Sequence, residues 1–242
     1  MPTDPATNGA SRPRAASRWS TLYGLGALSA VLVAGLVLLA VLLWPLWPHV
    51  FGVLDAEAVL AGIQRAPVEL LFRLDPVVLW ATVAQVPLFL ALWAALRAVD
   101  EGWALFALAV GAVAVAAVMP TRPILELYTL SDLHAAAPPG ERHVYVAAAE
   151  ALLAQFHGAA WATSIFCGGT AGLTWSVLML RSADFRALTA WVGIAGGAGS
   201  MIFFVPGIGI LSLFLLGTVG AVIWLLLVAA DLFALWRRTR QP

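Results

Sequence analysis

Two histidines and a glutamate share one helical stripe, a pattern that can indicate a metal site. His143, Glu150 and His157 follow one another at intervals of seven residues. Seven residues extend about 10.5 Å along a helix, whereas the ligands of one zinc ion lie about 2.0–2.2 Å from the metal. A site would need further ligands from the preceding segment, namely Glu126, Asp132 or His134. Nothing in the spacing requires such a fold, so we expect solvated residues and no metal.

The apolar segments lack the residue types that intramembrane enzymes and cofactor proteins use. They contain no Asp, Glu, Arg or His, and the chain has no HExxH motif. Haem ligation needs inward-facing histidines, a serine nucleophile needs a nearby base, and an ion-coupled transporter usually carries a carboxylate or histidine at the membrane midplane. We therefore expect no catalytic residues and no cofactor.

Neutral polar side chains remain as candidates for a polar lining between helices. Gln85 lies in an apolar segment, two residues before Pro87, and an unpaired amide in hydrocarbon is costly. We predict that Gln85 points into the bundle and pairs with the stretch 163–167. Another apolar segment supplies the further candidates Thr163, Ser164, Cys167 and Thr170. These residues could pack helices together or line a cavity for a small neutral or amphiphilic molecule.

Small residues four apart predict close helix contacts. Gly168 with Gly172, and Gly193 with Gly197, are such pairs within apolar segments. Small residues let two helix backbones approach without lipid between them. We expect both pairs to pack against neighbouring helices.

Asp231 is an acid at the edge of the last apolar segment, six residues before Arg237. Water and lipid headgroups are within reach at that depth, so it could be an ordinary interfacial acid. The alternative is a fixed partner for an arginine on another helix.

The composition indicates how these residues are positioned. Of the 242 residues, 62% are hydrophobic and 11% charged, against about 25% charged in a soluble domain. A spanning helix needs about 20 mostly apolar residues. Six segments approach this length: 20–44, 77–96, 103–119, 158–180, 187–205 and 209–230. The predicted fold is an all-α polytopic membrane protein with six transmembrane helices, a disordered tail at 1–18, a transmembrane domain at 19–237 and a tail at 238–242.

Charge placement predicts the orientation. The 13 basic residues balance 13 acidic ones, so no net positive field favours nucleic acid. Nine arginines fall in the termini and the short loops, and four fall in the two long loops. Arginine enrichment on the inner side of membranes places both termini in the cytoplasm. Of the tryptophans, all except Trp224 fall near the end of a segment, as interfacial aromatic belts predict.

The two long outer loops carry predicted amphipathic helices. Asp55 can cap a helix over 56–65 with Val59, Leu60 and Ile63 on one face, and 123–136 is helical by its apolar spacing. We expect these helices to lie on the outer membrane interface. We also expect Asp75 to cap the second span, and a helix to run unbroken from Glu141 to Leu180.

Three short motifs resemble an uncharacterised family of bacterial six-helix membrane proteins, domain of unknown function 4386. They are VELLFRL at 68–74, LRS at 180–182 and DLFALW at 231–236. The chain departs from the family pattern at Asp231, where Glu is usual, before Arg186, where Pro is usual, and at Gly111 and Ala112, where a polar or basic residue is usual. The resemblance implies the fold and a membrane location, and no activity.

The sequence therefore favours a multi-pass protein of the bacterial cytoplasmic membrane that is not an enzyme. It would act through helix, loop or lipid contacts, with the lipid bilayer, a membrane protein or a second copy of itself as partner. The alternative is a carrier or sensor of a small neutral or amphiphilic molecule, which a wide cavity reaching Gln85 would favour.

Overall fold

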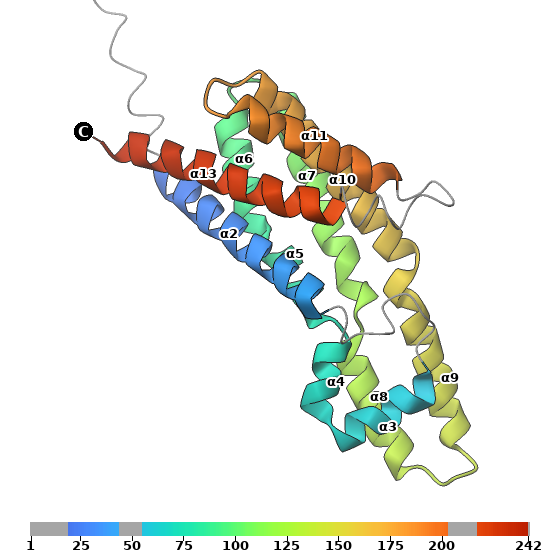
Figure 1. Cartoon of the computed structure of the whole chain (residues 1–242). Coiled ribbons are helices and arrows are strands. Elements are labelled where there is room, and N and C mark those ends of the chain that lie inside the picture. The colour runs from blue at the N-terminus through green and yellow to red at the C-terminus, as the bar shows by residue number, and fades with distance from the viewer. Residues whose placement is uncertain (1–18, 44–54, 203–216, 242) are drawn as a thin grey trace, which may run out of the picture.

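The computed structural model describes residues 19–43, 55–202 and 217–241, and in this part of the chain all regular structure is helical. Figure 1 shows a bundle of long helices with a smaller group of helices projecting from one end. In chain order the helices are α2 (Ser20–Leu43), α3 (Ala56–Arg65), α4 (Pro67–Arg73), α5 (Pro76–Ala84), α6 (Val86–Leu96), α7 (Glu101–Val118), η2 (Met119–Thr121), α8 (Ile124–Ala136), α9 (Arg142–Leu153), η3 (Ala154–His157), α10 (Ala159–Leu180), α11 (Ala187–Ile202) and α13 (Gly220–Arg240).

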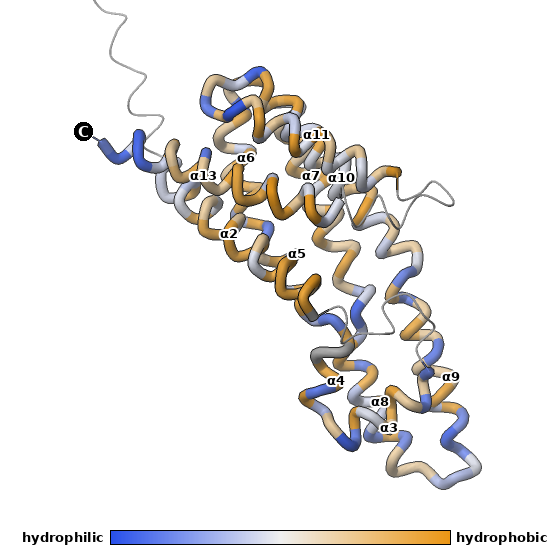
Figure 2. Tube along the Cα trace, viewed as in Figure 1, coloured by the Kyte–Doolittle hydropathy of each residue, from blue (hydrophilic) through white to orange (hydrophobic). Residues whose placement is uncertain are grey.

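The helices of the bundle have the length and composition of membrane-spanning elements. Five helical stretches within the described residues are long and apolar enough to cross a membrane, and α11 is a shorter apolar helix of 16 residues. Many of their large apolar side chains point outward, including Leu28 at 66% and Leu42 at 75% exposure. Figure 2 shows the apolar residues concentrated in the bundle and the polar ones at its ends and in the projecting group. An exposed apolar surface of this kind is typical of a protein surrounded by lipid.

Small residues bring particular helices close together. A methyl group at Gly26 would lie 2.3 Å from the Cβ of Ala91, so α2 and α6 meet almost backbone to backbone there. Gly24 leaves room in the same way for the Trp236 ring of α13. Helices α2 and α13 form one close pair, and α10 packs along both α7 and α11.

The helices between the spans form a second hydrophobic core. Asp55 accepts hydrogen bonds from the backbone N–H groups of Glu57 and Ala58, so α3 begins where predicted. Its apolar residues Leu60 and Ile63 are 0% and 3% exposed, and burial of each contributes about 1.5–3 kcal/mol.

These buried residues pack against α8, α9 and η3, so the apolar face of α3 is covered by protein instead of being left for the membrane interface. We call α3, α4, α8 and α9 the outer lobe.

Two long helices are interrupted. The predicted helix from Glu141 to Leu180 is wrong in its continuity, because α9 ends in the 3₁₀ turn η3 and Gly158 is extended, with ψ of −167°. The predicted second span divides into α5 and α6 at Gln85. Pro87 has no N–H to donate and its ring clashes with a carbonyl of the preceding turn, which explains this second break.

The ends of some predicted segments differ from the structure or lie outside it. Helix α13 continues through Arg240, so the residues 238–240 that were expected in a tail are helical. The predicted tail at 1–18 lies outside the described residues, as do 203–205 and 209–216 of the last two predicted spans.

Candidate functional site

The described helices line a partly open cavity of about 320 Å³ in the bundle. Residues from α2, α5, α6, α7, α10, α11 and α13 line it, and none of its described lining residues is charged. Its apolar wall includes Val33, Leu88, Phe89, Ile165 and Leu225, and its polar groups are Thr82, Gln85, Ser164, Ser200, Thr218, Trp161 and Trp224. An uncharged cavity of this volume falls within the range of small-molecule sites in proteins.

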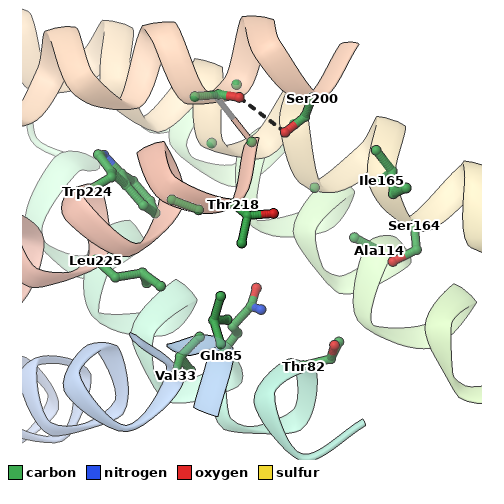
Figure 3. Close-up of a pocket in the computed structure, with 18 of the residues that line it drawn as sticks. Val33, Thr82, Gln85, Ala114, Ser164, Ile165, Ser200, Thr218, Trp224 and Leu225 are labelled. Atoms are coloured by element: carbon green, nitrogen blue, oxygen red, sulfur yellow. Dashed lines mark hydrogen bonds between the residues drawn. The ribbon is translucent and has the colours of Figure 1, made fainter. Parts of the chain in front are cut away.

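Gln85 lies at the break between α5 and α6. Because Pro87 interrupts the helical hydrogen bonds, carbonyl groups of the preceding turn become available. The Ser29 hydroxyl of α2 donates a hydrogen bond to the Ala84 carbonyl. The backbone N–H of Gln85 donates to the carbonyls of Thr82 and Val83. The kink therefore directs the Gln85 side chain toward the centre of the cavity, opposite Thr218 (Figure 3).

The predicted pairing of Gln85 with the stretch 163–167 is wrong. Ser164 lines the same cavity, but the Gln85 amide makes no hydrogen bond with a described residue. The cavity itself separates them, because α10 packs on α7 and α11 far more than on α6. An amide that offers two donors and one acceptor therefore faces the cavity without a partner in the part of the chain that the structure describes.

The other predicted lining residues divide into two groups. Only Ser164 lines the cavity, whereas Thr163 is exposed and the free thiol of Cys167 is half-buried outside the lining. The Thr170 hydroxyl donates to the Phe166 carbonyl of its own helix, at 2.8 Å. Thr82 and Ser200, which do line the cavity, were not identified from the sequence, although both are polar residues in apolar segments.

The predicted glycine pairs also differ from each other. A Cβ at Gly193 would lie 2.0 Å from the Ser176 hydroxyl and 2.3 Å from the Trp224 Nε1, and one at Gly197 would lie 3.0 Å from the Gly169 carbonyl. These two glycines allow α11 to approach α10 and α13. No non-neighbouring atom lies within 4 Å of a Cβ at Gly172, and at Gly168 the nearest is 3.9 Å away. Gly168 and Gly172 form part of the cavity wall.

Asp231 is the partner of an arginine on another segment, as one of its two predicted interpretations required. Its Oδ1 accepts from Arg186 Nε at 2.6 Å, and its Oδ2 accepts from Thr189 Oγ1 at 2.6 Å and from the Arg186 backbone N–H at 3.4 Å. Arg186 directly precedes α11, so the carboxylate of α13 satisfies donors at the beginning of that helix.

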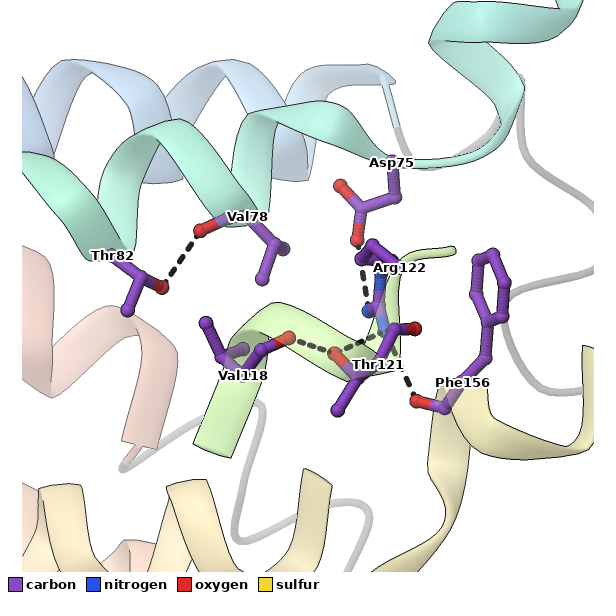
Figure 4. A network of polar contacts seen from close by, with 7 residues as sticks. All are labelled: Asp75, Val78, Thr82, Val118, Thr121, Arg122 and Phe156. Atoms are coloured by element: carbon purple, nitrogen blue, oxygen red, sulfur yellow. Dashed lines mark hydrogen bonds and ion pairs between the residues drawn. The ribbon is translucent and has the colours of Figure 1, made fainter. Parts of the chain in front are cut away.

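A second ion pair lies where the outer lobe joins the bundle (Figure 4). Arg122 Nη2 is 3.2 Å from Asp75 Oδ2, and the two side chains are only 3% and 12% exposed. Arg122 Nη1 donates to the Phe156 carbonyl at 3.1 Å, and it also donates to the backbone carbonyl and the side-chain hydroxyl of Thr121. Its guanidinium also lies 4.9 Å from the ring centre of Trp161, which lines the cavity.

Asp75 therefore does not cap α5 as predicted. Its side chain makes no capping hydrogen bond, and its backbone is left-handed with φ of 56°. Burial raises the pKa of the Asp75 carboxyl above its ordinary value, and the Arg122 charge opposes this rise. Asp75 Oδ1 and Arg122 Nε are buried without a hydrogen-bond partner among the described residues.

No protein-family profile, curated protein or solved structure matches this chain. In the described residues, no group of three or more His, Cys, Asp or Glu could hold a metal ion. His143 and Glu150 are both exposed on α9.

Proposed function

We propose that this protein binds a small, uncharged, amphiphilic molecule inside the membrane, as a carrier or sensor. The observation that carries the proposal is a cavity whose described lining residues are uncharged, faced by a Gln85 amide that has no hydrogen-bond partner among the described residues. An apolar body would contact Leu88, Phe89 and Leu225, and one polar group, a hydroxyl or carbonyl, would pair with Gln85. An ionised group would find no opposite charge among the described lining residues.

We also propose that the chain is a non-enzymatic multi-pass protein of the bacterial cytoplasmic membrane, with six spans and cytoplasmic termini. Support comes from the apolar helices and from the arginines at one end of the bundle, which include Arg97, Arg181 and Arg238. We propose as well that the chain is a member of the family called domain of unknown function 4386. Reporter fusions after Pro242 and within 55–75 should report opposite compartments.

The cavity can be filled without disturbing its neighbours, which gives a direct test. Gly172→Leu places a side chain in the cavity, where a Cβ meets nothing within 4 Å. Gly35→Leu is the matched control, because Gly35 is exposed on α2 and its Cβ also meets nothing within 4 Å. Each protein is purified in mild detergent, and its co-purified small molecules are identified by mass spectrometry.

A neutral amphiphile should accompany the wild-type protein and Gly35→Leu, and it should be lost from Gly172→Leu. Gln85→Leu, which removes the amide but keeps an apolar lining, should reduce the bound amount about tenfold, since one buried hydrogen bond contributes about 1 kcal/mol or slightly more. Equal occupancy in wild type and Gly172→Leu, or an empty wild-type protein, would contradict the proposal.

A further inference from the structure

Arg97 lies against two tryptophan rings at the C-terminal end of α6, which is at the end of the bundle away from the outer lobe (Figure 1). It directly follows α6, and its guanidinium carbon lies 4.7 Å from the ring centre of Trp19 and 5.2 Å from that of Trp93. The two rings meet edge to face, with their centres 5.7 Å apart. Contacts with ring faces fix the position of the cation, but they leave its N–H donors available in the plane of the guanidinium.

Three acids at this end are already engaged. Asp184 pairs with Arg238 at 3.6 Å, Asp231 pairs with Arg186, and Asp100 accepts a hydrogen bond from the Trp103 N–H. In the ranges that the structure describes, no carboxylate lies within ion-pair distance of the remaining arginines at this end, which are Arg97, Arg181, Arg237 and Arg240.

Two of the arginines at this end, Arg97 and Arg240, lie near the beginning of α2. Arg240 lies 4.5 Å from the ring centre of Trp236, and Trp236 packs against Gly24 of α2. Trp19 directly precedes the same helix. Six arginines face four acids in the described residues here, an excess of two positive charges, namely Arg97, Arg181, Arg186, Arg237, Arg238 and Arg240 against Asp100, Glu101, Asp184 and Asp231.

An apolar track leads away from this charged end. Leu90 and Val86 of α6 are 39% and 42% exposed, and their spacing places them on one stripe of the helix with Trp93 and Arg97. A cation held on aromatic rings above an exposed apolar stripe matches the order of groups in a phospholipid, which has a phosphate above its acyl chains. Tryptophan rings are enriched at the depth of the lipid headgroups.

We propose that Arg97, positioned by Trp19 and Trp93, binds the phosphate of an anionic phospholipid whose acyl chain lies along Leu90 and Val86 of α6, with Arg240 supplying a second cation. A planar guanidinium can donate two parallel hydrogen bonds to a phosphate. The net positive charge favours an anionic headgroup over a zwitterionic one. This site is separate from the cavity and does not depend on the occupant of the cavity.

Thermal unfolding of the full chain in a neutral detergent tests this assignment. Phosphatidylglycerol is titrated into the wild-type protein and into Arg97→Gln, and phosphatidylcholine with identical acyl chains is titrated in parallel. Arg65→Gln is the matched control, because Arg65 lies on α3 in the outer lobe. Phosphatidylglycerol should raise the melting temperature of the wild type and of Arg65→Gln, and Arg97→Gln should need at least a tenfold higher lipid concentration for the same rise.

Circular dichroism first establishes that each variant has wild-type helix content. Arg240→Gln should also weaken the stabilisation by phosphatidylglycerol, but less than Arg97→Gln does. Equal stabilisation by the two lipids in the wild type would overturn the proposal, as would an Arg97→Gln titration that matches the control. Inorganic phosphate is tested at the same concentrations. A matching rise in melting temperature with phosphate alone would assign the site to the free ion and overturn the lipid assignment.

Discussion

Asp75 with Arg122 and Asp231 with Arg186 are aspartate–arginine pairs at opposite ends of the bundle. In the first pair both side chains are buried, whereas in the second the arginine is 53% exposed and only the aspartate is buried. Asp231 has a donor on each oxygen, while Asp75 Oδ1 and Arg122 Nε have no partner among the described residues. The two pairs therefore differ in how far their charges are removed from water and in how completely they are hydrogen-bonded, and we expect these differences to decide what each pair contributes to stability.

The reason lies in desolvation. Removing both Asp75 and Arg122 from water costs free energy that their attraction offsets only in part. The raised pKa of Asp75 agrees with this, because a carboxyl that folding had made easier to ionise would have a lowered pKa. The pair at the junction is therefore a poor net stabiliser, yet neither member can be removed alone without cost. At the other end, water can solvate Arg186 when its partner is lost.

The largest expected effect is that of Asp75→Ala. It leaves the Arg122 charge buried and unpaired, so unfolding titrations in mixed detergent should show a loss of about 3–5 kcal/mol. Asp75→Asn keeps a hydrogen-bond acceptor and suits the left-handed backbone, so it should lose less. If Asp75→Ala is no more destabilising than Asp231→Ala, the distinction between the two pairs fails.

The pH dependence of the same two proteins follows from the raised pKa. A folded state with a raised carboxyl pKa binds a proton more tightly than the unfolded chain, so the wild-type protein gains stability from Asp75 as the pH falls. Asp75→Asn cannot make this gain. The unfolding free energy of the wild type, relative to that of Asp75→Asn, should therefore rise as the pH is lowered. A fall in this difference on acidification would show that folding lowers the pKa of Asp75.

Asp231→Ala should have the second largest effect. It removes the acceptor for the buried Thr189 hydroxyl and for donors at the beginning of α11, but Arg186 remains in contact with solvent. We expect a loss of about 2 kcal/mol, in the range for hydrogen bonds to a charged group. Hydrogen exchange should report the opening of the first turn of α11, and uniform exchange along α11 would contradict a capping role.

Thr189→Val isolates one contact of that carboxylate. The side chain keeps its shape and loses only the hydroxyl that lies 2.6 Å from Asp231 Oδ2. Its cost should be about 1 kcal/mol, and it should largely disappear in the Asp231→Ala background. If the losses of unfolding free energy add in the double mutant, the Thr189 hydroxyl stabilises the fold through a contact other than Asp231.

Asp184→Ala should have the smallest effect. Its ion pair with Arg238 spans 3.6 Å, and the two side chains are 47% and 64% exposed. Exposed pairs contribute about 0–1 kcal/mol, so the melting temperature should change by no more than a degree or two. A larger loss would mean that exposure is not what separates the pairs in this protein.

The sequence predicted those features that depend on neighbours along the chain. The Asp55 cap and the apolar residues Val59, Leu60 and Ile63 located α3, since capping and helical periodicity are local properties. The pairing of Asp75 with Arg122 could not be found in this way, because 47 residues separate them and the pair exists only after three helices meet.

The candidate cavity was predicted only in part for the same reason. Pro87 marked the position of the kink and Gln85 the inward amide, but the relation between α6 and α10 depends on how α7 and α11 pack. Four glycines with the same spacing looked equivalent in the sequence. Only the surrounding helices make Gly193 and Gly197 close-contact residues, leave Gly168 in loose contact with Ala114, and leave Gly172 with no described atom within 4 Å of its Cβ position.

This division of the glycines sets different limits on sequence divergence on the two sides of the cavity. Any side chain at Gly193 would overlap Ser176 and Trp224, so a lineage that keeps this fold has almost no route to another residue there. Gly172 can accept larger residues one carbon at a time, and each step reduces the cavity volume while α10 stays in place. Selection for a smaller occupant could therefore proceed through α10 alone, while the α11 wall stays unchanged.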